Sequence, residues 1–251
     1  MKLNEISAVV CAKNERNRVE KCVANLRNIG VGEIIVVDGC STDGTADLAK
    51  AVADKVLQDK GTGIGAARNI GIKVATKKLV LNFGIDNEIT KNDLEKMIDD
   101  LLSRNVAGVT AQTHVVGEDY LSRCLDMYKR ARFNPGERKV IGTPQLFKRE
   151  KILSYMFDDN RVYSDDAELC ERMSELEDAK FLISEAIVLE FGENSLSAMK
   201  RRWLLYGKSD SEIYSSHLSK WSTKRKLQSI AYPLKKELIE PFLFHGVWRG
   251  L

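Results

Sequence analysis

Apolar runs of strand length alternate with segments of helical periodicity along the N-terminal part of the chain. Residues 6–12 (ISAVVCA) and 33–38 (EIIVVD) are rich in Val and Ile and have the length of strands buried on both faces. Between them, apolar residues recur at the spacing of a helix, at Val19, Cys22, Val23, Leu26 and Ile29. The pattern predicts a strand, a helix and a second strand.

The alternation continues further along the chain. A second helix is predicted to begin near Thr45, after the turn cluster GCSTDG, and a third to cover residues 66–76. Apolar runs at 55–57 and 79–83 predict strands, and Thr90 can cap a fourth helix. The apolar faces of the second and fourth helices are Leu48, Ala49, Val52 and Val56, and Leu94, Met97, Ile98, Leu101 and Leu102. This order predicts an α/β fold, with a mostly parallel sheet and helices on both faces.

Composition places the chain among ordinary globular proteins. Its 251 residues suffice for one large α/β domain or a domain with an appendage, and 43% of them are hydrophobic and 30% charged. The 5 cysteines form no C-x-x-C pair, which is typical of reduced thiols in the cytosol. No window approaches the roughly 18 apolar residues of a membrane span, and the apolar stretch near the N-terminus is too short for a signal peptide. We therefore expect a cytoplasmic protein.

Charge is unevenly distributed along the chain. Of 39 Lys and Arg and 36 Asp and Glu, 11 and 4 lie from Ser197 onward, which leaves 28 and 32 in residues 1–196. We expect a mildly acidic body at residues 1–192 and a basic, aromatic, helical extension at residues 193–251. The extension contains no recognisable nucleic-acid-binding module, so nucleic acid is not an expected partner.

Residues 61–66 (GTGIGA) match a dinucleotide-binding loop. They fit G-x-G-x-x-A, a helix is predicted to follow, and Asp86 lies 20 residues further on at a strand end, as in the Rossmann fingerprint. The context is less favourable, because Gln58, Asp59 and Lys60 separate the loop from a short strand and two βα units precede it. A plain loop leading into a helix is the alternative.

Other common chemistries lack their motifs. His114, His217 and His245 are isolated and show no metal-ligand spacing. The chain contains neither G-x-S-x-G nor G-x-x-x-x-G-K-[ST], which disfavours a serine hydrolase and a P-loop protein.

Five segments occur in an order that points to a known family. They are AVVCAKNER, EIIVVDGCSTDGT, KGTGIGAARNIGI, LVLNFGIDNEI and SDDAELCERM. Together they resemble a family 2 glycosyltransferase of the GT-A fold, over residues 6 to about 190. Two departures are visible: Gly39 and Cys40 follow Asp38 where the family has Asp-Gly, and the family's D-x-D motif is Gly84-Ile85-Asp86.

The resemblance implies a site for the donor nucleotide. Asp38 would accept a hydrogen bond from the imide N–H of a base, and Arg68 would lie near the base or the diphosphate. The residues implied at this site are Cys11, Lys13, Glu15, Asp38, Gly65, Arg68, Gly84 and Ile85. The resemblance also implies that the glycine-rich 61–65 loop allows close approach of its backbone to the nucleotide. The structural alternatives are a turn-capping aspartate at Asp38 and a solvated arginine at Arg68.

The resemblance also implies a divalent cation, Mg²⁺ or Mn²⁺, held by Asp86. Such an ion takes few protein carboxylates, so one Asp can suffice when diphosphate and water supply the other ligands. Gly84 offers only backbone in place of the first Asp of the motif, and Asn87 and Glu88 are the nearby residues that can compensate. A helix-capping or surface role for either is the alternative.

Asp165 and Asp166 correspond to the acidic pair that carries the chemistry in the family. Asp166 would take the proton of the acceptor hydroxyl during inverting transfer, and Asp165 would raise the pKa of its neighbour through like charge. Two acids that stabilise a helix N-terminus are the structural alternative.

The basic segment near residue 201 resembles the post-catalytic helix of membrane-associated family members. Its implied contacts with the diphosphate or a lipid-linked acceptor are made by Arg201, Arg202, Trp203 and Tyr206. The sequence thus predicts a metal-assisted inverting glycosyltransferase that uses a UDP- or GDP-sugar, peripheral on the inner face of the membrane. Two alternatives stay open: a helical pair packed on the sheet, and a non-catalytic nucleotide-binding or membrane-docking relic of the fold.

Overall fold

The computed structural model describes most of the chain up to residue 227. The described residues are 2–61, 63–161, 164–192, 195–201, 204–205, 208, 212, 218–223 and 226–227. The strands are β1 (Ile6–Ala12), β2 (Glu33–Asp38), β3 (Lys55–Gln58), β4 (Leu79–Phe83), β5 (Asn87–Ile89), β6 (Gly108–Val115), β7 (Gly136–Arg138), β8 (Gln145–Lys148) and β9 (Phe181–Glu190). The helices are α1 (Val19–Asn28), α2 (Thr45–Val52), α3 (Ile64–Val74), α4 (Lys91–Ser103), α5 (Tyr120–Arg132), α6 (Arg149–Tyr155) and α7 (Asp165–Glu177), after a short 3-10 turn at Leu3–Glu5.

The N-terminal half of the sheet is parallel. Strands β3, β2, β1 and β4 lie side by side in that order, each connected to the next along the chain by a helix. The predicted strands and helices are present, with two adjustments. Helix α3 begins at Ile64 rather than 66, and Val56 belongs to β3 rather than to the face of α2, because α2 ends at Val52.

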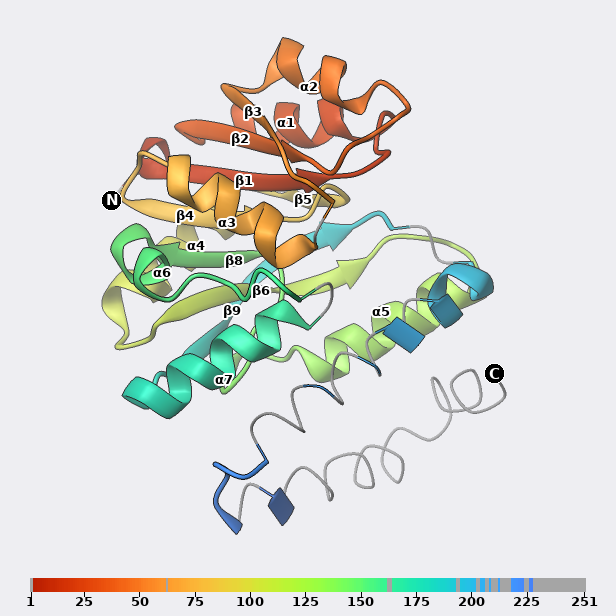
Figure 1. The fold of residues 1–251 in the computed structure, drawn as a ribbon. Coiled ribbons are helices and arrows are strands. Elements are labelled where there is room, and N and C mark those ends of the chain that lie inside the picture. The colour runs from red at the N-terminus through yellow and green to blue at the C-terminus, as the bar shows by residue number, and fades with distance from the viewer. Residues whose placement is uncertain are drawn as a thin grey trace.

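The C-terminal half of the sheet has mixed strand directions. Strand β8 runs antiparallel to both β4 and β6, β9 runs parallel to β6, and β5 and β7 pair antiparallel with opposite ends of β9. Among the described residues these strands and the parallel half form one 9-stranded sheet. Figure 1 shows the curled sheet running from β3 at the top to β9 below.

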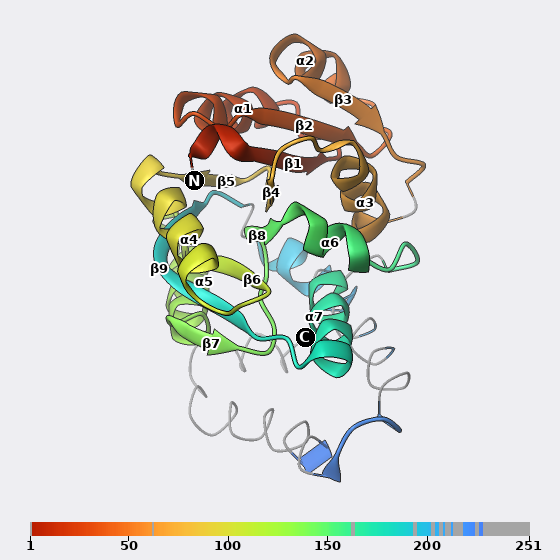
Figure 2. The ribbon, with the colours of Figure 1, turned by 90° about the vertical axis from the view of Figure 1, so that its left-hand side faces the viewer.

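Helices cover both faces of the sheet. Figure 2 shows α1 and α4 on one side and α3, α6 and α7 on the other. Two hydrophobic cores correspond to these sides. The first core joins Leu26 and Met97 to the sheet, and the second joins Ile72, Ile152 and Leu169 to it. Burial of these apolar side chains, worth roughly 1.5–3 kcal/mol each, holds both layers to the sheet.

Helix starts follow the local signals in the sequence. The hydroxyl of Thr90 accepts a hydrogen bond from the N–H of Asp93 at 3.2 Å, so Thr90 caps α4 as predicted. Helix α7 begins at Asp165, directly after Ser164 in a left-handed conformation (φ 54°). A non-glycine residue rarely adopts this conformation, which here turns the chain so that the two acids open the helix.

The predicted extension at residues 193–251 lies largely outside the described residues, and its boundary stays a prediction. None of the helices in the described part of the chain is long and apolar enough to cross a bilayer.

Candidate active site

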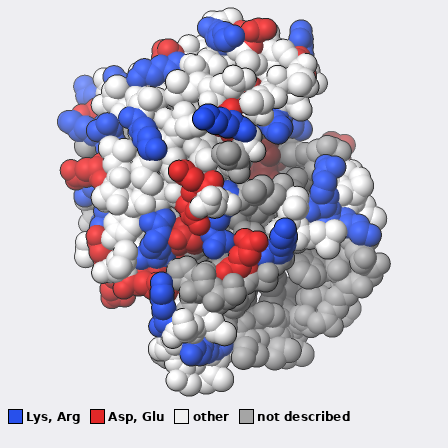
Figure 3. All heavy atoms as spheres, in the orientation of Figure 1, with Lys and Arg blue, Asp and Glu red and all other residues white. Residues whose placement is uncertain are grey.

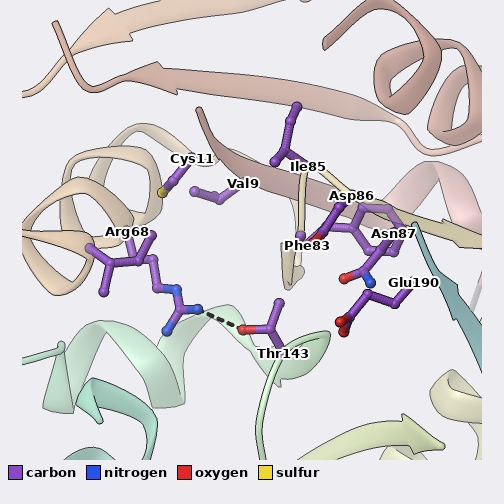
Figure 4. A pocket seen from close by; sticks show the side chains of 11 residues that line it. Val9, Cys11, Arg68, Phe83, Ile85, Asp86, Asn87, Thr143 and Glu190 are labelled. Carbon is purple, nitrogen blue, oxygen red and sulfur yellow. Dashed lines mark hydrogen bonds between the residues drawn. The ribbon is translucent and has the colours of Figure 1, made fainter. Parts of the chain in front are cut away.

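A cavity of about 220 Å³ opens at the carboxyl ends of β1 and β4. Figure 4 shows Cys11 and Arg68 on one side of it and Asp86, Asn87 and Glu190 on the other, with Thr143 between them. The lining residues are Val9, Cys11, Ile64, Arg68, Phe83, Gly84, Ile85, Asp86, Asn87, Thr143 and Glu190. Carboxyl ends of strands are the usual ligand-binding edge of α/β sheets.

Arg68 joins the cavity to the two acids of α7. One nitrogen of its guanidinium, Nη1, forms salt bridges with both Asp165 and Asp166, and Nη2 donates to the hydroxyl of Thr143 at 2.6 Å. The guanidinium carbon lies 5.1 Å from the centre of the Phe157 ring. Arg68 is only 8% exposed, so it is a buried connector rather than a solvated arginine of the first helical turn.

The charges around Asp166 act on it in opposite directions. Burial raises its pKa, Arg68 lowers it, and the negative charge of Asp165 raises it again, which gives a pKa of about 7. The nearby side chain of Gln145 also lowers the pKa of Asp166. A carboxylate that exchanges its proton near neutral pH is suited to act as a general base.

A second pair of carboxylates lies across the cavity. Asp86 and Glu190 both line it, and the pKa of Asp86 is raised by burial and by the negative charge of Glu190. Glu190 forms a salt bridge with Lys129 of α5, whereas no salt bridge to Asp86 is present among the described residues. The backbone of Asp86 is held in place because its carbonyl accepts from the N–H of Phe191 at 2.8 Å.

These carboxylates meet the chemical requirements of a hard divalent cation. Oxygen ligands are those that Mg²⁺ and Mn²⁺ prefer, and Mg²⁺ commonly binds one or two protein carboxylates together with phosphate oxygens and water. No group of three or more His, Cys, Asp or Glu in the described part of the chain could hold a metal by itself. The donor set therefore fits an ion shared with a phosphate ligand, not an all-protein cage.

Neighbouring side chains fill the space beside Gly84, so this position has no room for a Cβ. A Cβ at this position would collide with Oδ1 of Asn87 and lie 2.9 Å from Oδ1 of Asp86. Asn87 is 4% exposed, and its backbone N–H donates to the carbonyl of Gly84 at 3.0 Å. Asn87 thus occupies the space beside Gly84 and turns toward the cavity, whereas Glu88 forms a salt bridge with Lys21.

Asp38 lies at the end of β2 and is 1% exposed. Its Oδ2 accepts a hydrogen bond from the N–H of Ser41 at 3.0 Å, which is the turn-capping contact. Its Oδ1 has no hydrogen-bond partner among the described residues. A buried carboxylate oxygen with a free lone pair is suited to accept from a ligand.

Other predicted donor-site residues have structural contacts of their own. The thiol of Cys11 lines the cavity, and burial raises its pKa to about 12, so it remains protonated. Lys13 is exposed and packs against Gly39, and Glu15 forms a salt bridge with Arg18 at 2.8 Å. A Cβ at Gly65 would lie 2.6 Å from the carbonyl oxygen of Asp158. The absence of a side chain at Gly65 therefore lets the backbone at Asp158 pack closely against it. Their roles toward a nucleotide stay predictions.

The predicted acceptor region is only partly described. Arg201 is exposed, and Arg202, Trp203 and Tyr206 lie outside the described residues. On the face in Figure 3, basic and acidic side chains of the described residues are interspersed, without a broad patch of one sign.

Thr143 and Glu190 line the cavity but were not predicted from the sequence. Glu190 ends the apolar run FLISEAIVLE, so its position at a strand end is the same kind of signal that predicts Asp86. Thr143 lies in a loop and reaches Arg68 across 75 residues of sequence, for which no local pattern exists.

Two solved structures with bound nucleotide ligands have a similar fold. A Staphylococcus aureus TarS fragment in complex with UDP-GlcNAc matches with a TM-score of 0.57 at 17% identity, over 78% of this chain and 60% of that one. GalNAc-T7 with UDP, GalNAc and Mn²⁺ matches with a TM-score of 0.60 at 13% identity, over 75% and 44%. At these identities the likeness shows the fold, which is GT-A.

The family model described as glycosyl transferase family 2 matches residues 7–168, more than half of the chain. The chain belongs to glycosyltransferase family 2. The succinoglycan biosynthesis protein ExoO of Rhizobium meliloti (strain 1021) is 31% identical over 168 residues, 62% of this chain and 47% of ExoO. The putative glycosyltransferase EpsH of Bacillus subtilis (strain 168) is 26% identical over 170 residues, 61% and 49%. The chain thus spans about half of the length of these two relatives.

Family membership replaces the dinucleotide interpretation of residues 61–66. In the structure, Gly61 and Gly63 have left-handed φ values of 69° and 148°, and α3 begins only at Ile64. Glycine is the residue that adopts these φ values without strain, and the absence of a Cβ at Gly65 allows close packing against the carbonyl of Asp158. The glycine pattern therefore has a conformational explanation that does not involve a dinucleotide.

Proposed function

We propose that the protein transfers a sugar from a nucleotide-diphosphate donor to a hydroxyl or lipid-phosphate acceptor, with inversion and with the help of a divalent cation. One observation carries the proposal. A single cavity at the carboxyl ends of β1 and β4 has Asp86 and Glu190 on one side and Arg68, linked to Asp165 and Asp166, on the other. Membership of glycosyltransferase family 2 supports this chemistry for the site.

Asp38 recognises the base of the donor in this proposal. Its Oδ1, which has no partner within the described part of the chain, accepts a hydrogen bond from the N–H of a base, and both uracil and guanine present such a donor. This supports UDP- or GDP-sugars as the donor class. The solved neighbours with UDP-GlcNAc, or with UDP and GalNAc, are consistent with a uridine nucleotide.

Asp86 holds the cation, with Glu190 as the second carboxylate beside the diphosphate. When bound, the ion would neutralise negative charge on the departing nucleoside diphosphate. In metal-assisted reactions this lowers the activation free energy by several kcal/mol. Glu190 is held at the cavity by Lys129, which orients its carboxylate.

Asp166 accepts the proton of the acceptor oxygen as that oxygen attacks the anomeric carbon from the face opposite the leaving group. A pKa of about 7 places the deprotonated and protonated forms at similar populations near neutral pH. Arg68 keeps the carboxylate oriented from α3, and Asp165 balances the charge of Arg68. Arg68 is therefore a positioning residue for the base as well as part of the cavity wall.

A lipid-linked acceptor and peripheral attachment to the inner face of the membrane extend the proposal. They rest on the basic and aromatic sequence after residue 197. Deleting residues from about 222 onward should weaken binding to anionic liposomes, because each basic residue near such a surface contributes about 1 kcal/mol. Equal binding of the full and shortened chains would contradict membrane attachment without touching the proposed transfer reaction.

The donor can be identified by thermal unfolding with a panel of nucleotide-sugars and Mg²⁺ or Mn²⁺. A donor at 100 times its dissociation constant should stabilise the protein by about 2.7 kcal/mol. Release of the nucleoside diphosphate in the presence of candidate acceptors then measures transfer. A protein that binds donor yet transfers sugar to no acceptor would instead be a nucleotide-binding relic, an alternative that Gly84 in the D-x-D position keeps open.

A further inference from the structure

The hydroxyl of Thr143 lies in the cavity, between its two charged sides. Figure 4 shows Thr143 with Arg68 on one side and the carboxylates of Asp86 and Glu190 on the other. The hydroxyl oxygen accepts a hydrogen bond from Nη2 of Arg68 at 2.6 Å, which is its one hydrogen bond among the described residues. A hydroxyl can accept and also donate, so that of Thr143 has a hydrogen to offer to a ligand in the cavity.

Two hydrogen bonds hold the loop that carries Thr143. The hydroxyl of Thr110 on β6 donates to the carbonyl of Gly142 at 2.9 Å. The amide of Gln145 on β8 donates to the carbonyl of Ile141 at 3.1 Å. Because both contacts fix the backbone next to Thr143, the fold itself places this side chain in the cavity wall.

The same loop lies beside the acids of α7. A Cβ at Gly142 would lie 3.9 Å from Oδ2 of Asp166. Arg68, the hydrogen-bond partner of Thr143, forms salt bridges with both Asp165 and Asp166. Thr143 is thus in direct contact with the guanidinium that holds the proposed base.

The proposed reaction puts the transferred sugar in the middle of the cavity. In that reaction the departing diphosphate lies beside Asp86 and the acceptor oxygen beside Asp166. Inversion requires the two oxygens to lie on opposite faces of the anomeric carbon, so the sugar ring is located between these acids. Thr143 occupies this intermediate position in the wall.

We propose that Thr143 is a specificity-determining residue for the transferred sugar: its hydroxyl accepts from Arg68 and donates to an oxygen of that sugar. Hydrogen bonds in a chain polarise one another, so a hydroxyl that accepts from a guanidinium is a better donor. The contact links recognition of the sugar to the group that holds Asp166. The inference rests on the proposed function.

Two substitutions separate the hydroxyl of Thr143 from the shape of its side chain. Thr143→Val keeps the shape and removes the hydroxyl, whereas Thr143→Ser keeps the hydroxyl. Thr110→Val is the matched control, because it removes a hydroxyl that holds the same loop but does not line the cavity. All variants are made in the full chain.

The contact with Arg68 is tested without any ligand. Hydrogen exchange of the guanidinium N–H groups of Arg68, followed by nitrogen NMR, should become about tenfold faster in Thr143→Val, because Nη2 loses its acceptor. Thr143→Ser and Thr110→Val should keep the exchange within about twofold of that of the unaltered protein. Unchanged exchange in Thr143→Val, or an equal acceleration in Thr110→Val, overturns the link between Thr143 and Arg68.

The contact with the sugar is tested by isothermal titration in the presence of Mn²⁺. The probes are UDP-GlcNAc, UDP-glucose and GDP-mannose, each compared with its own nucleoside diphosphate. Thr143→Val should weaken binding of the nucleotide-sugar about tenfold, the effect of one lost hydrogen bond, and change that of the nucleoside diphosphate by less than about twofold. Thr143→Ser should restore the affinity for the nucleotide-sugar, and Thr110→Val should leave the ratio of the two affinities unchanged.

Three results overturn the sugar contact while leaving the proposed function in place. They are unchanged binding of the nucleotide-sugar by Thr143→Val, equal weakening of nucleotide-sugar and nucleoside diphosphate, which would place the contact on the diphosphate, and the same change of ratio in Thr110→Val. Failure of the proposed function is distinguishable, because the unaltered protein would then bind no nucleotide, and the sugar contact would fall with it.

Discussion

The two carboxylate pairs around the cavity differ in how their charge is balanced. Asp165 and Asp166 share the guanidinium of Arg68, which the fold brings in from α3. Asp86 and Glu190 have no shared salt-bridge partner in the described part of the chain: Lys129 forms a salt bridge with Glu190 and lowers the pKa of Asp86 only through its charge, as Arg18 also does. The first pair is compensated by a buried arginine of the protein, whereas the second is the pair that we propose to be neutralised by a cation bound with the donor.

The difference also fits the two roles that we propose for these pairs. A carboxylate held by a buried arginine keeps a defined geometry and a proton equilibrium near neutrality, which suits proton transfer. A carboxylate pair without a shared cation repels itself, and this repulsion is relieved when a cation binds. Four substitutions test the comparison, in order of decreasing expected effect.

Asp166→Asn should reduce sugar transfer by roughly 10² to 10⁴, the usual contribution of a positioned proton acceptor. The amide keeps the shape of the side chain but cannot take the proton, and donor affinity should barely change. Transfer is measured as nucleoside diphosphate release, and donor affinity by thermal shift. Asp99→Asn removes an exposed acid on α4 and serves as the charge-matched control. Transfer at the unaltered rate in Asp166→Asn would refute its assignment as the base.

Arg68→Met should destabilise the fold by about 3 kcal/mol at pH 8, because it leaves two carboxylates without their buried partner. Without Arg68, burial and mutual repulsion raise the pKa values of these carboxyl groups above those of the unfolded chain. Stability is therefore lost as the pH rises, and the deficit should be smaller at pH 5 than at pH 8. Urea unfolding at both pH values measures it.

The ion pair between the exposed Arg104 and the partly buried Asp100 provides the control, since Arg104→Met should change stability by less than about 1 kcal/mol at either pH. A deficit in Arg68→Met that does not depend on pH would mean that Arg68 contributes through packing on Phe157 rather than through charge.

Asp86→Asn should lower metal-dependent nucleotide affinity by roughly 100-fold, consistent with the several kcal/mol that a bound ion contributes. Unfolding without nucleotide should be nearly unchanged, because Asp86 forms no salt bridge among the described residues. Isothermal titration with and without Mg²⁺ or Mn²⁺ gives the result. Equal metal dependence in the variant and the unaltered protein would remove Asp86 from the cation site.

Asp165→Asn should have the smallest effect, a shift of the pH dependence of transfer. In the unaltered protein, transfer should increase about tenfold per pH unit below the Asp166 pKa of about 7 and level off above it. Removing the negative charge of Asp165 lowers the pKa of Asp166, so the rising limb should move to lower pH. If the rising limb of the pH dependence instead moves to higher pH, Asp165 acts mainly by holding Arg68 in place, since Arg68 lowers the pKa of Asp166.

The sequence predicted the parallel half of the molecule better than the mixed half. β2 and β4 are continuous apolar runs, with Asp38 at the end of β2 and Asp86 shortly after the end of β4, so both candidate site residues could be recognised locally. The arrangement of β8 between β4 and β6 depends on pairings between residues far apart in sequence. The salt bridge from Arg68 to Asp165 of α7 joins residues that are 97 positions apart in the sequence, and no periodic pattern predicts it. The family resemblance selected these acids, but the role of Arg68 as their partner required the structure.

The contact between Gly84 and Asn87 makes the two positions interdependent for protein engineering. Adding Asp at 84 alone places a Cβ against the buried amide of Asn87, so the single change meets a steric barrier before its new carboxylate can act. Shortening Asn87 to Ala first opens the space at the cost of one cavity-lining side chain. The effects of the two substitutions are therefore not additive, and a complete D-x-D motif is reached through position 87 before position 84.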